Sequence, residues 1–132
     1  MLRQTQPGGP PPTLLLGVGA DPQQAARARA EGADLIDVRD ATPRALAAIR
    51  ASLPAGVLWT DTGAAPLDAD RLAGSLAGRV TPAAVIATAA VCTWLGAPVV
   101  RSRHTRAVRR AIDMTASIAG GRPPSRTVRG LA

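Results

Sequence analysis

Apolar segments of strand length alternate with alanine-rich segments of helical length along this chain. The apolar runs predict four strands, at 13–18, 35–38, 57–60 and 99–101. The segments between and after them predict five helices, at 22–31, 43–53, 67–77, 82–95 and 105–118. Strands that alternate with helices are typical of a parallel sheet. We therefore predict an α/β fold in which four βα-type units form a parallel sheet.

The boundaries of these elements are marked by recurring residue pairs. Three helices begin with an N-cap residue followed by proline, at Asp21-Pro22, Thr42-Pro43 and Thr81-Pro82. Two stretches, 31–39 and 95–103, also resemble each other: each passes from an alanine-rich segment through Gly-Ala into a short apolar run that ends in polar residues. That order predicts a helix stopped by glycine, then a strand, then a polar strand end.

The composition predicts one domain with two flanking segments. Residues 1–12 are rich in proline and glycine and are expected to be a disordered lead-in, 13–119 a single α/β domain, and 120–132 a mobile basic tail. The helix at 82–95 is apolar throughout, so we expect it to be buried, with Cys92 as a small core residue. Neither a signal peptide nor an apolar run of about 20 residues is visible, so we expect a cytoplasmic protein and no membrane partner.

The charge is concentrated after residue 100. The chain has a net charge of +7 and no lysine; residues 1–100 carry eight arginines and eight acids, and residues 101–132 carry eight arginines and one acid. This favours either an anion site or a solvated helix face plus a basic tail, and we expect the second for Arg109, Arg110, Arg122, Arg126 and Arg129. Nucleic acid is not an expected partner, because the only aromatic residues are two tryptophans and no known binding motif accompanies the arginines.

Charged residues occupy equivalent positions at two predicted strand ends. Asp37 and Arg101 match in the repeat, and so do Arg39 and Arg103. Ligands of parallel sheets bind at the carboxyl ends of the strands, where arginine holds phosphate or carboxylate with two hydrogen bonds. One hypothesis is that Asp37, Arg101 and Arg103 converge on a ligand. The other, of equal weight, is an internal Asp–Arg ion pair with no ligand.

Three further positions have a functional and a structural interpretation. Asp61 follows the third strand, where it could bind a heterocycle or a metal, or shape an Asx-turn. His104 lies between the last strand and the last helix, as an acid/base group or as a cap. Gly17 and Gly19 resemble part of a dinucleotide-binding fingerprint whose third glycine is absent.

Two blocks within residues 13–118 contain motifs of a known family. The first block contains the run Gly32-Ala33-Asp34-Leu35-Ile36-Asp37-Val38 and the strand end Thr60-Asp61-Thr62. The second block is 83–104, in which an alanine-rich helix leads through Leu95-Gly96-Ala97 into Val99-Val100-Arg101. These motifs resemble those of dihydropteroate synthases, the pterin-binding (βα)8 barrels of folate synthesis. The resemblance implies a truncated, partial TIM-barrel-like domain without the middle strands of the barrel.

The resemblance also implies an activity and a set of ligand-binding residues. The family joins a pterin pyrophosphate to p-aminobenzoate with the help of Mg²⁺. By resemblance, Asp37 is carried over as a ligand-binding residue, Asp61 contacts the pterin ring, and Arg101 with Arg103 and His104 contacts the pyrophosphate. Much of the family's catalytic set is missing: the family's Gly-Gly-Glu-Ser loop is replaced by Arg39-Asp40-Ala41-Thr42, and its loop lysine is absent. No catalytic residue is assigned.

Two functions follow from the resemblance. The first is binding of a pterin or another anionic small molecule, with folate-pathway transfer only after assembly. The alternative is a non-catalytic partner that completes or regulates a full-length barrel. An open sheet has edges that must be covered. We therefore expect either a homo-oligomer or pairing with a barrel homologue.

Overall fold

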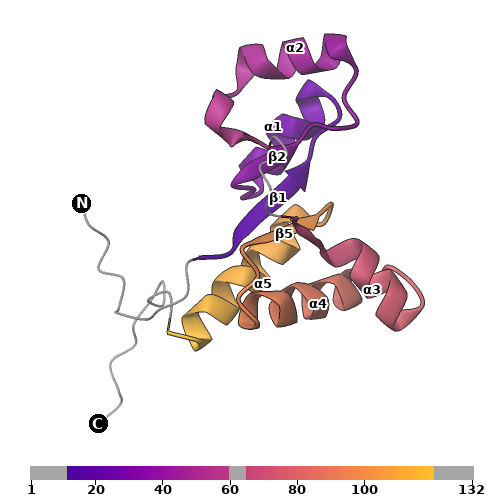
Figure 1. Ribbon diagram of the computed structural model, residues 1–132, viewed down its shortest axis with the longest axis vertical. Coiled ribbons are helices and arrows are strands. Elements are labelled where there is room, and N and C mark those ends of the chain that lie inside the picture. Colours follow the sequence, from indigo (N-terminus) through magenta and orange to yellow (C-terminus); the bar gives the residue numbers. More distant parts are fainter. Residues whose placement is uncertain (1–11, 60–64, 121–132) are drawn as a thin grey trace.

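Five parallel strands form one sheet in the part of the chain that the structure describes (Figure 1). The computed structural model describes residues 12–59 and 65–120. The strands are β1 (Leu14–Val18), β2 (Leu35–Asp37), β3 (Leu58–Trp59), β4 (Leu67–Asp68) and β5 (Val99–Ser102). Their order across the sheet is β3-β2-β1-β5-β4. The first strand therefore lies beside the last, as it does in a closed barrel, and the predicted α/β, partial TIM-barrel-like class is confirmed.

The strand at 67–68 was not predicted. The sequence indicated four strands, with 67–77 wholly helical, whereas Leu67 and Asp68 pair with Val100 and Arg101 of β5. Only then does α3 begin, and the Asp68 side chain caps it by accepting a hydrogen bond from the Arg71 N–H at 3.1 Å. Two residues are too few to show the alternation that identifies a strand in sequence.

The helices lie close to their predicted positions. They are α1 (Pro22–Ala30), α2 (Pro43–Ser52), a short 3-10 helix (Ala55–Val57), α3 (Ala69–Ala77), α4 (Pro82–Trp94) and α5 (Thr105–Ile118). At each predicted Asp-Pro or Thr-Pro start, the side chain of the first residue accepts a hydrogen bond from the backbone N–H three residues on, at 2.8 to 3.2 Å. The three predicted N-caps are thus confirmed.

The sequence repeat is also a structural repeat. The helices α1 and α4 both end in a glycine with positive φ, Gly32 at 109° and Gly96 at 85°. After each glycine the N–H of an alanine returns to a carbonyl five residues back, from Ala33 to Ala28 and from Ala97 to Cys92, both at 3.0 Å. This is the Schellman motif, and it delivers the chain directly into β2 and β5.

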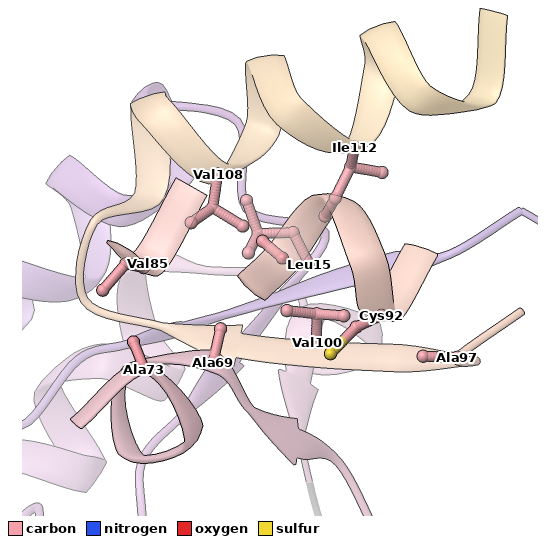
Figure 2. Packing of buried hydrophobic residues seen from close by; sticks show 10 residues of the cluster. Leu15, Ala69, Ala73, Val85, Cys92, Ala97, Val100, Val108 and Ile112 are labelled. Carbon is pink, nitrogen blue, oxygen red and sulfur yellow. The ribbon is translucent and has the colours of Figure 1, made fainter. Parts of the chain in front are cut away.

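The helices pack on one face of the sheet, where two core clusters lie. Leu15 and Val100 point from β1 and β5 toward α3, α4 and α5, and Figure 2 shows their side chains beside Val108 and Ile112. Ile36 points from β2 toward α1 and α2. Alternate residues, Leu16, Val99 and Trp59, form a separate cluster on the opposite face. Almost the whole core is aliphatic or alanine, as the composition predicts.

Gly19 lets α1 approach the sheet. A Cβ atom there would lie 2.8 Å from the Ala25 Cα and 2.8 Å from the Ile36 Cγ2. Gly17 has similar neighbours, since its Cβ would meet the methyl groups of Ala28 and Ala33 at 3.0 Å. Close packing of α1 against the sheet explains both glycines, so they need no dinucleotide-binding role.

Helix α4 is buried on one side only, whereas the sequence predicted a buried helix. Val85, Ala89 and Cys92 face the core, and Cys92 is a buried free cysteine as expected. Ile86, Val91 and Trp94 are exposed on its other side. A helix that is apolar all round gives no sign in sequence of which face lies outward.

Some of the segments named in the sequence analysis lie outside the residues that the structure describes. The lead-in up to residue 11, Asp61 and the tail from residue 121 are not described. Among the described helices, none alone is long and apolar enough to cross a membrane. Only α3 and α4 taken together, with a bend of 113° between them, pass that test of length and composition.

Candidate functional site

The predicted pair Asp37 and Arg101 is in direct contact at the carboxyl end of the sheet. The Arg101 Nε donates a hydrogen bond to the Asp37 Oδ2 at 2.8 Å, across β1 from β5 to β2. Both side chains are largely buried, with 3% of Asp37 and 11% of Arg101 exposed. Register explains the contact, because both residues project from the helix-free face near the ends of their strands.

A second carboxylate holds the same arginine. The Arg101 Nη1 donates to the Asp68 Oδ2 at 2.9 Å, while the Asp68 Oδ1 caps α3. Asp68 is opposite Arg101 in the register between β4 and β5. Arg101 thus bridges two acids from two different strands, and its charge is neutralised inside the protein.

Arg39 covers the other side of Asp37. Its Nη2 donates to the Asp37 Oδ2 at 2.8 Å, and its backbone N–H donates to the Asp37 Oδ1 at 3.0 Å. The guanidinium carbon of Arg39 also lies 4.6 Å from the centroid of the Trp59 ring, within the range of a cation–π interaction. Two guanidinium groups therefore surround one carboxylate.

The pKa of Asp37 reflects this environment. Burial raises the pKa of the carboxyl, but hydrogen bonds from Arg39 and Arg101 outweigh burial and hold the pKa below its usual value. Asp37 is therefore ionised at neutral pH. A buried carboxylate in this state accepts hydrogen bonds and cannot serve as a general acid.

Arg103 and His104 do not join this ion-pair cluster. The Arg103 side chain is exposed and lines a cavity of about 320 Å³ with Val18, Gln24, Arg27, Ala28, Glu31 and Thr105. His104 is the residue before α5, and its side chain makes no capping hydrogen bond. The strand turns at this point because Asp70 accepts hydrogen bonds from the Ser102 hydroxyl at 2.6 Å and the Arg103 N–H at 2.9 Å.

Arg109 was predicted to lie on a solvated helix face, but in the structure it forms two ion pairs. Its Nη1 donates to the Asp34 Oδ2 at 2.8 Å, and its Nη2 lies 2.9 Å from the Asp113 Oδ1. Arg109 thereby fastens α5 to the turn before β2. Arg110 is exposed as predicted; Arg122, Arg126 and Arg129 lie outside the described residues.

The described residues do not fit the Mg²⁺ ion that the family resemblance implies. Magnesium is bound through free carboxylate oxygens and water, whereas both oxygens of Asp37 accept hydrogen bonds from guanidinium groups. Within 12–59 and 65–120, no three His, Cys, Asp or Glu side chains gather as a metal-binding group. Asp61, the residue for which metal binding was one of the alternatives, lies outside these ranges.

Sequence reasoning missed Asp68 and Asp70, the acids that fix Arg101 and the end of β5. Both were assigned to a helix, and nothing local indicates their partners, which are 33 and 32 residues away. The only available signal was the Asp68-x-Asp70 pattern at a helix start, where acids are common for capping alone.

Comparison with known proteins gives a partial match. Over 63 residues the chain is 48% identical to "Inactive dihydropteroate synthase 2" of Mycobacterium tuberculosis (strain ATCC 25618 / H37Rv), and the match covers 48% of this chain and 17% of that protein. The protein of the same name from Mycobacterium leprae (strain TN) is 46% identical over 63 residues, which cover 48% of this chain and 18% of that protein. No family model matches the chain, and no solved structure gives a significant match. Over these 63 residues the chain is therefore similar to dihydropteroate synthases, and it spans only a small part of the length of the relatives that it matches.

Proposed function

We propose that this chain is a non-catalytic, dihydropteroate synthase-like protein that acts by associating with a barrel homologue. The observation that carries the proposal is the double ion pair of Arg101 with Asp37 and Asp68. The arginine predicted to hold an anionic substrate is instead bound on two sides by carboxylates of its own chain.

The energetics of a buried ion pair support this proposal. An incoming pyrophosphate would have to displace Asp37 or Asp68 and leave a carboxylate buried without its partner, which costs several kcal/mol. Positioning of the reactants and stabilisation of the charge on the departing pyrophosphate supply most of the catalysis in such a transfer. A site whose principal cation is already neutralised supplies little of either.

The sheet edges support association. β3 and β4 are the outermost strands, and each has a paired neighbour on one side only among the described residues. Edge strands present unpaired backbone N–H and C=O groups, which natural proteins cover or block. A full-length barrel is closed and has no free edge strand of its own, so its outer helices and loops, rather than its strands, are what can cover these edges.

The names of the curated relatives agree with a non-catalytic role. The matching proteins of three mycobacteria are called inactive dihydropteroate synthase 2. The matched stretch covers only 17% of the first of them, so the absence of activity in this chain is our proposal.

The test combines an activity assay with a binding assay on the full chain. We expect no turnover of pterin pyrophosphate and p-aminobenzoate with Mg²⁺ by the chain alone, and a complex with a full-length dihydropteroate synthase in size-exclusion chromatography with light scattering. Leu67→Lys, which places a charge on the β4 edge, should weaken the complex. Leu76→Lys, on an exposed residue of α3, is the matched control. Turnover by the chain alone would contradict the proposal.

A second candidate function is binding of an anionic small molecule in the cavity beside Arg103. Arg103 lines this cavity together with Thr105, in the first turn of α5, and with Arg27, whose Nε lies 3.1 Å from the Glu31 carboxylate. The N-terminus of a helix favours anions, and a pterin pyrophosphate is the candidate that the family resemblance suggests. Calorimetric titration with this compound, with and without Mg²⁺, tests the idea. Arg103→Ala should abolish binding and Arg44→Ala, in the exposed first turn of α2, should not.

A further inference from the structure

A cavity of about 600 Å³ lies between α2 and the edge strand β3. It shares no lining residue with the cavity beside Arg103. Helix α2 is at the top of Figure 1, away from α3, α4 and α5. The volume of this second cavity is within the range of about 300–1,000 Å³ that small-molecule sites have in proteins, so it is large enough to hold a ligand.

The wall of this cavity is mostly aliphatic. Its aliphatic residues come from the segment after β2, from α2, from the 3-10 helix and from β3: Val38, Ala41, Leu46, Ala55 and Leu58. None of the five is fully buried, although Val38, Ala41 and Leu58 also pack against the core cluster around Ile36. Apolar side chains that remain open to water gain free energy when an apolar ligand covers them.

The lining residues follow the length of α2. Ala41 precedes the helix, Leu46 lies in its middle and Arg50 in its last turn. From Pro43 to Arg50 the helix rises about 10 Å, at about 1.5 Å per residue. An extended chain of eight carbons is about 9 Å long, at the roughly 1.2 Å per bond of an extended backbone. The cavity therefore suits an elongated aliphatic ligand of about this length.

Arg50 gives the cavity a positive charge near the end of α2. It lies four residues after Leu46, so both side chains are on the same side of the helix. Within 12–59 and 65–120, no hydrogen bond or ion pair holds the Arg50 guanidinium, and no acid lines the cavity. A guanidinium group binds a carboxylate through two parallel hydrogen bonds. The charge of the cavity therefore favours a carboxylate.

The other arginine of the wall is already engaged within the protein. The Arg39 Nε and Nη2 donate hydrogen bonds to the two carboxylate oxygens of Asp37, at 3.0 and 2.8 Å. The same guanidinium covers the ring of Trp59, which also lines the cavity. The carboxylate of a ligand therefore belongs on Arg50, and the fluorescence of Trp59 should report on what enters the cavity.

We propose that this cavity binds an aliphatic monocarboxylate of about eight carbons, with its carboxylate on Arg50 and its chain along Leu46 and Leu58. The proposal depends neither on pairing with a barrel homologue nor on the anion site beside Arg103, because it uses different residues. The ligand class also differs from a pterin pyrophosphate, since an aliphatic chain supplies most of the contact.

Fluorescence titration of the full chain with octanoate tests the proposal. Trp94→Phe leaves Trp59 as the only tryptophan, and we expect a saturable change in its emission. In this background Arg50→Ala should weaken octanoate binding about tenfold or more, because the carboxylate loses its charge-assisted hydrogen bonds. The matched control is Arg44→Ala, an exposed arginine of the same helix that does not line the cavity. Circular dichroism checks that the variants fold. No saturable change with octanoate, or equal losses in the two variants, would overturn the proposal.

Two further titrations test the charge and the place of the ligand. Octyltrimethylammonium has the same chain with a positive head group, so it should bind at least about tenfold more weakly than octanoate. Equal affinity for the two probes would show apolar adsorption without a carboxylate site and would overturn the proposal. Trp59→Phe keeps Trp94 of α4 as the reporter. A saturable response to octanoate from Trp94, with none from Trp59, would place the ligand on α4 and equally exclude the proposed site.

Discussion

The helices α1 and α4 have the same place in the structural repeat but opposite outer surfaces. Each begins with a capped proline, ends in a Schellman motif and leads into a strand. Outside the core, α1 exposes Arg27 and Arg29, whereas α4 exposes Val91 and Trp94. The local signals that build the two helices are therefore independent of which residues the helices expose.

The two strand ends of the repeat also differ, because they carry residues of opposite charge. Asp37 ends β2 and Arg101 lies at the equivalent position of β5, and these opposite charges bind each other. Asp37 is in register with Val18 and Arg101 with Leu16, so Arg101 starts two residues below Asp37 on the same face, and its long side chain extends past β1 to the carboxylate. At this rim the structure shows Arg101 paired with Asp37 and Asp68.

The largest expected effect comes from breaking this pair. Asp37→Ala leaves the buried Arg101 with Asp68 alone and should lower the free energy of unfolding by about 3–5 kcal/mol. Glu31→Ala, which removes the exposed pair with Arg27 at the end of α1, should cost only about 0.5 kcal/mol. Urea denaturation measures both. Similar decreases in unfolding free energy for the two variants would show that the buried ion pair of Asp37 contributes no more than an exposed one.

The two glycines of the repeat should respond unequally to alanine. Both have positive φ, which costs an L-residue about 1–2 kcal/mol. A Cβ at Gly32 would also lie 2.7 Å from the Arg109 Cγ, whereas a Cβ at Gly96 has no neighbour within 4 Å. We expect Gly32→Ala to be the more destabilising by about 1 kcal/mol in thermal or urea unfolding. A larger loss for Gly96→Ala would contradict this packing.

The fall in the free energy of unfolding at low pH should depend on Asp37. Its folded-state pKa is lowered, so its stabilisation is complete above the usual aspartate pKa of about 3.9 and is lost as the pH falls through the lower folded-state value. Urea denaturation between pH 5 and pH 2 should show unfolding free energy that falls with pH in the wild type and falls less steeply in Asp37→Asn. Parallel curves for the two proteins would show that Asp37 titrates normally.

The sequence predicts what depends on nearby residues. The three N-caps, the two helices stopped by glycine and the strands β1, β2 and β5 all follow from local patterns, and the structure confirms them. The contact between Asp37 and Arg101 was one of two open hypotheses, because strand alternation places both on one face without saying whether a ligand lies between them.

The rest depends on distant neighbours and was missed. β4 is only two residues long, and the pairing of Asp68 with Arg101 spans 33 positions. Exposure of Trp94 follows from how α4 packs on α3 and α5, which an unbroken apolar pattern does not specify. Arg109 was expected on a solvated face because its partner, Asp34, is 75 positions away.

A double-mutant cycle on Asp37 and Arg101, combined with a binding titration, tests most directly whether Arg101 serves the fold. Urea denaturation of Asp37→Asn, Arg101→Met and the double variant should give a coupling energy of about 1.5 kcal/mol or more. Arg101→Met should leave any affinity for pyrophosphate unchanged. A coupling below about 0.5 kcal/mol, together with loss of pyrophosphate binding in Arg101→Met, would show that Arg101 is a ligand-binding residue and contradict the account.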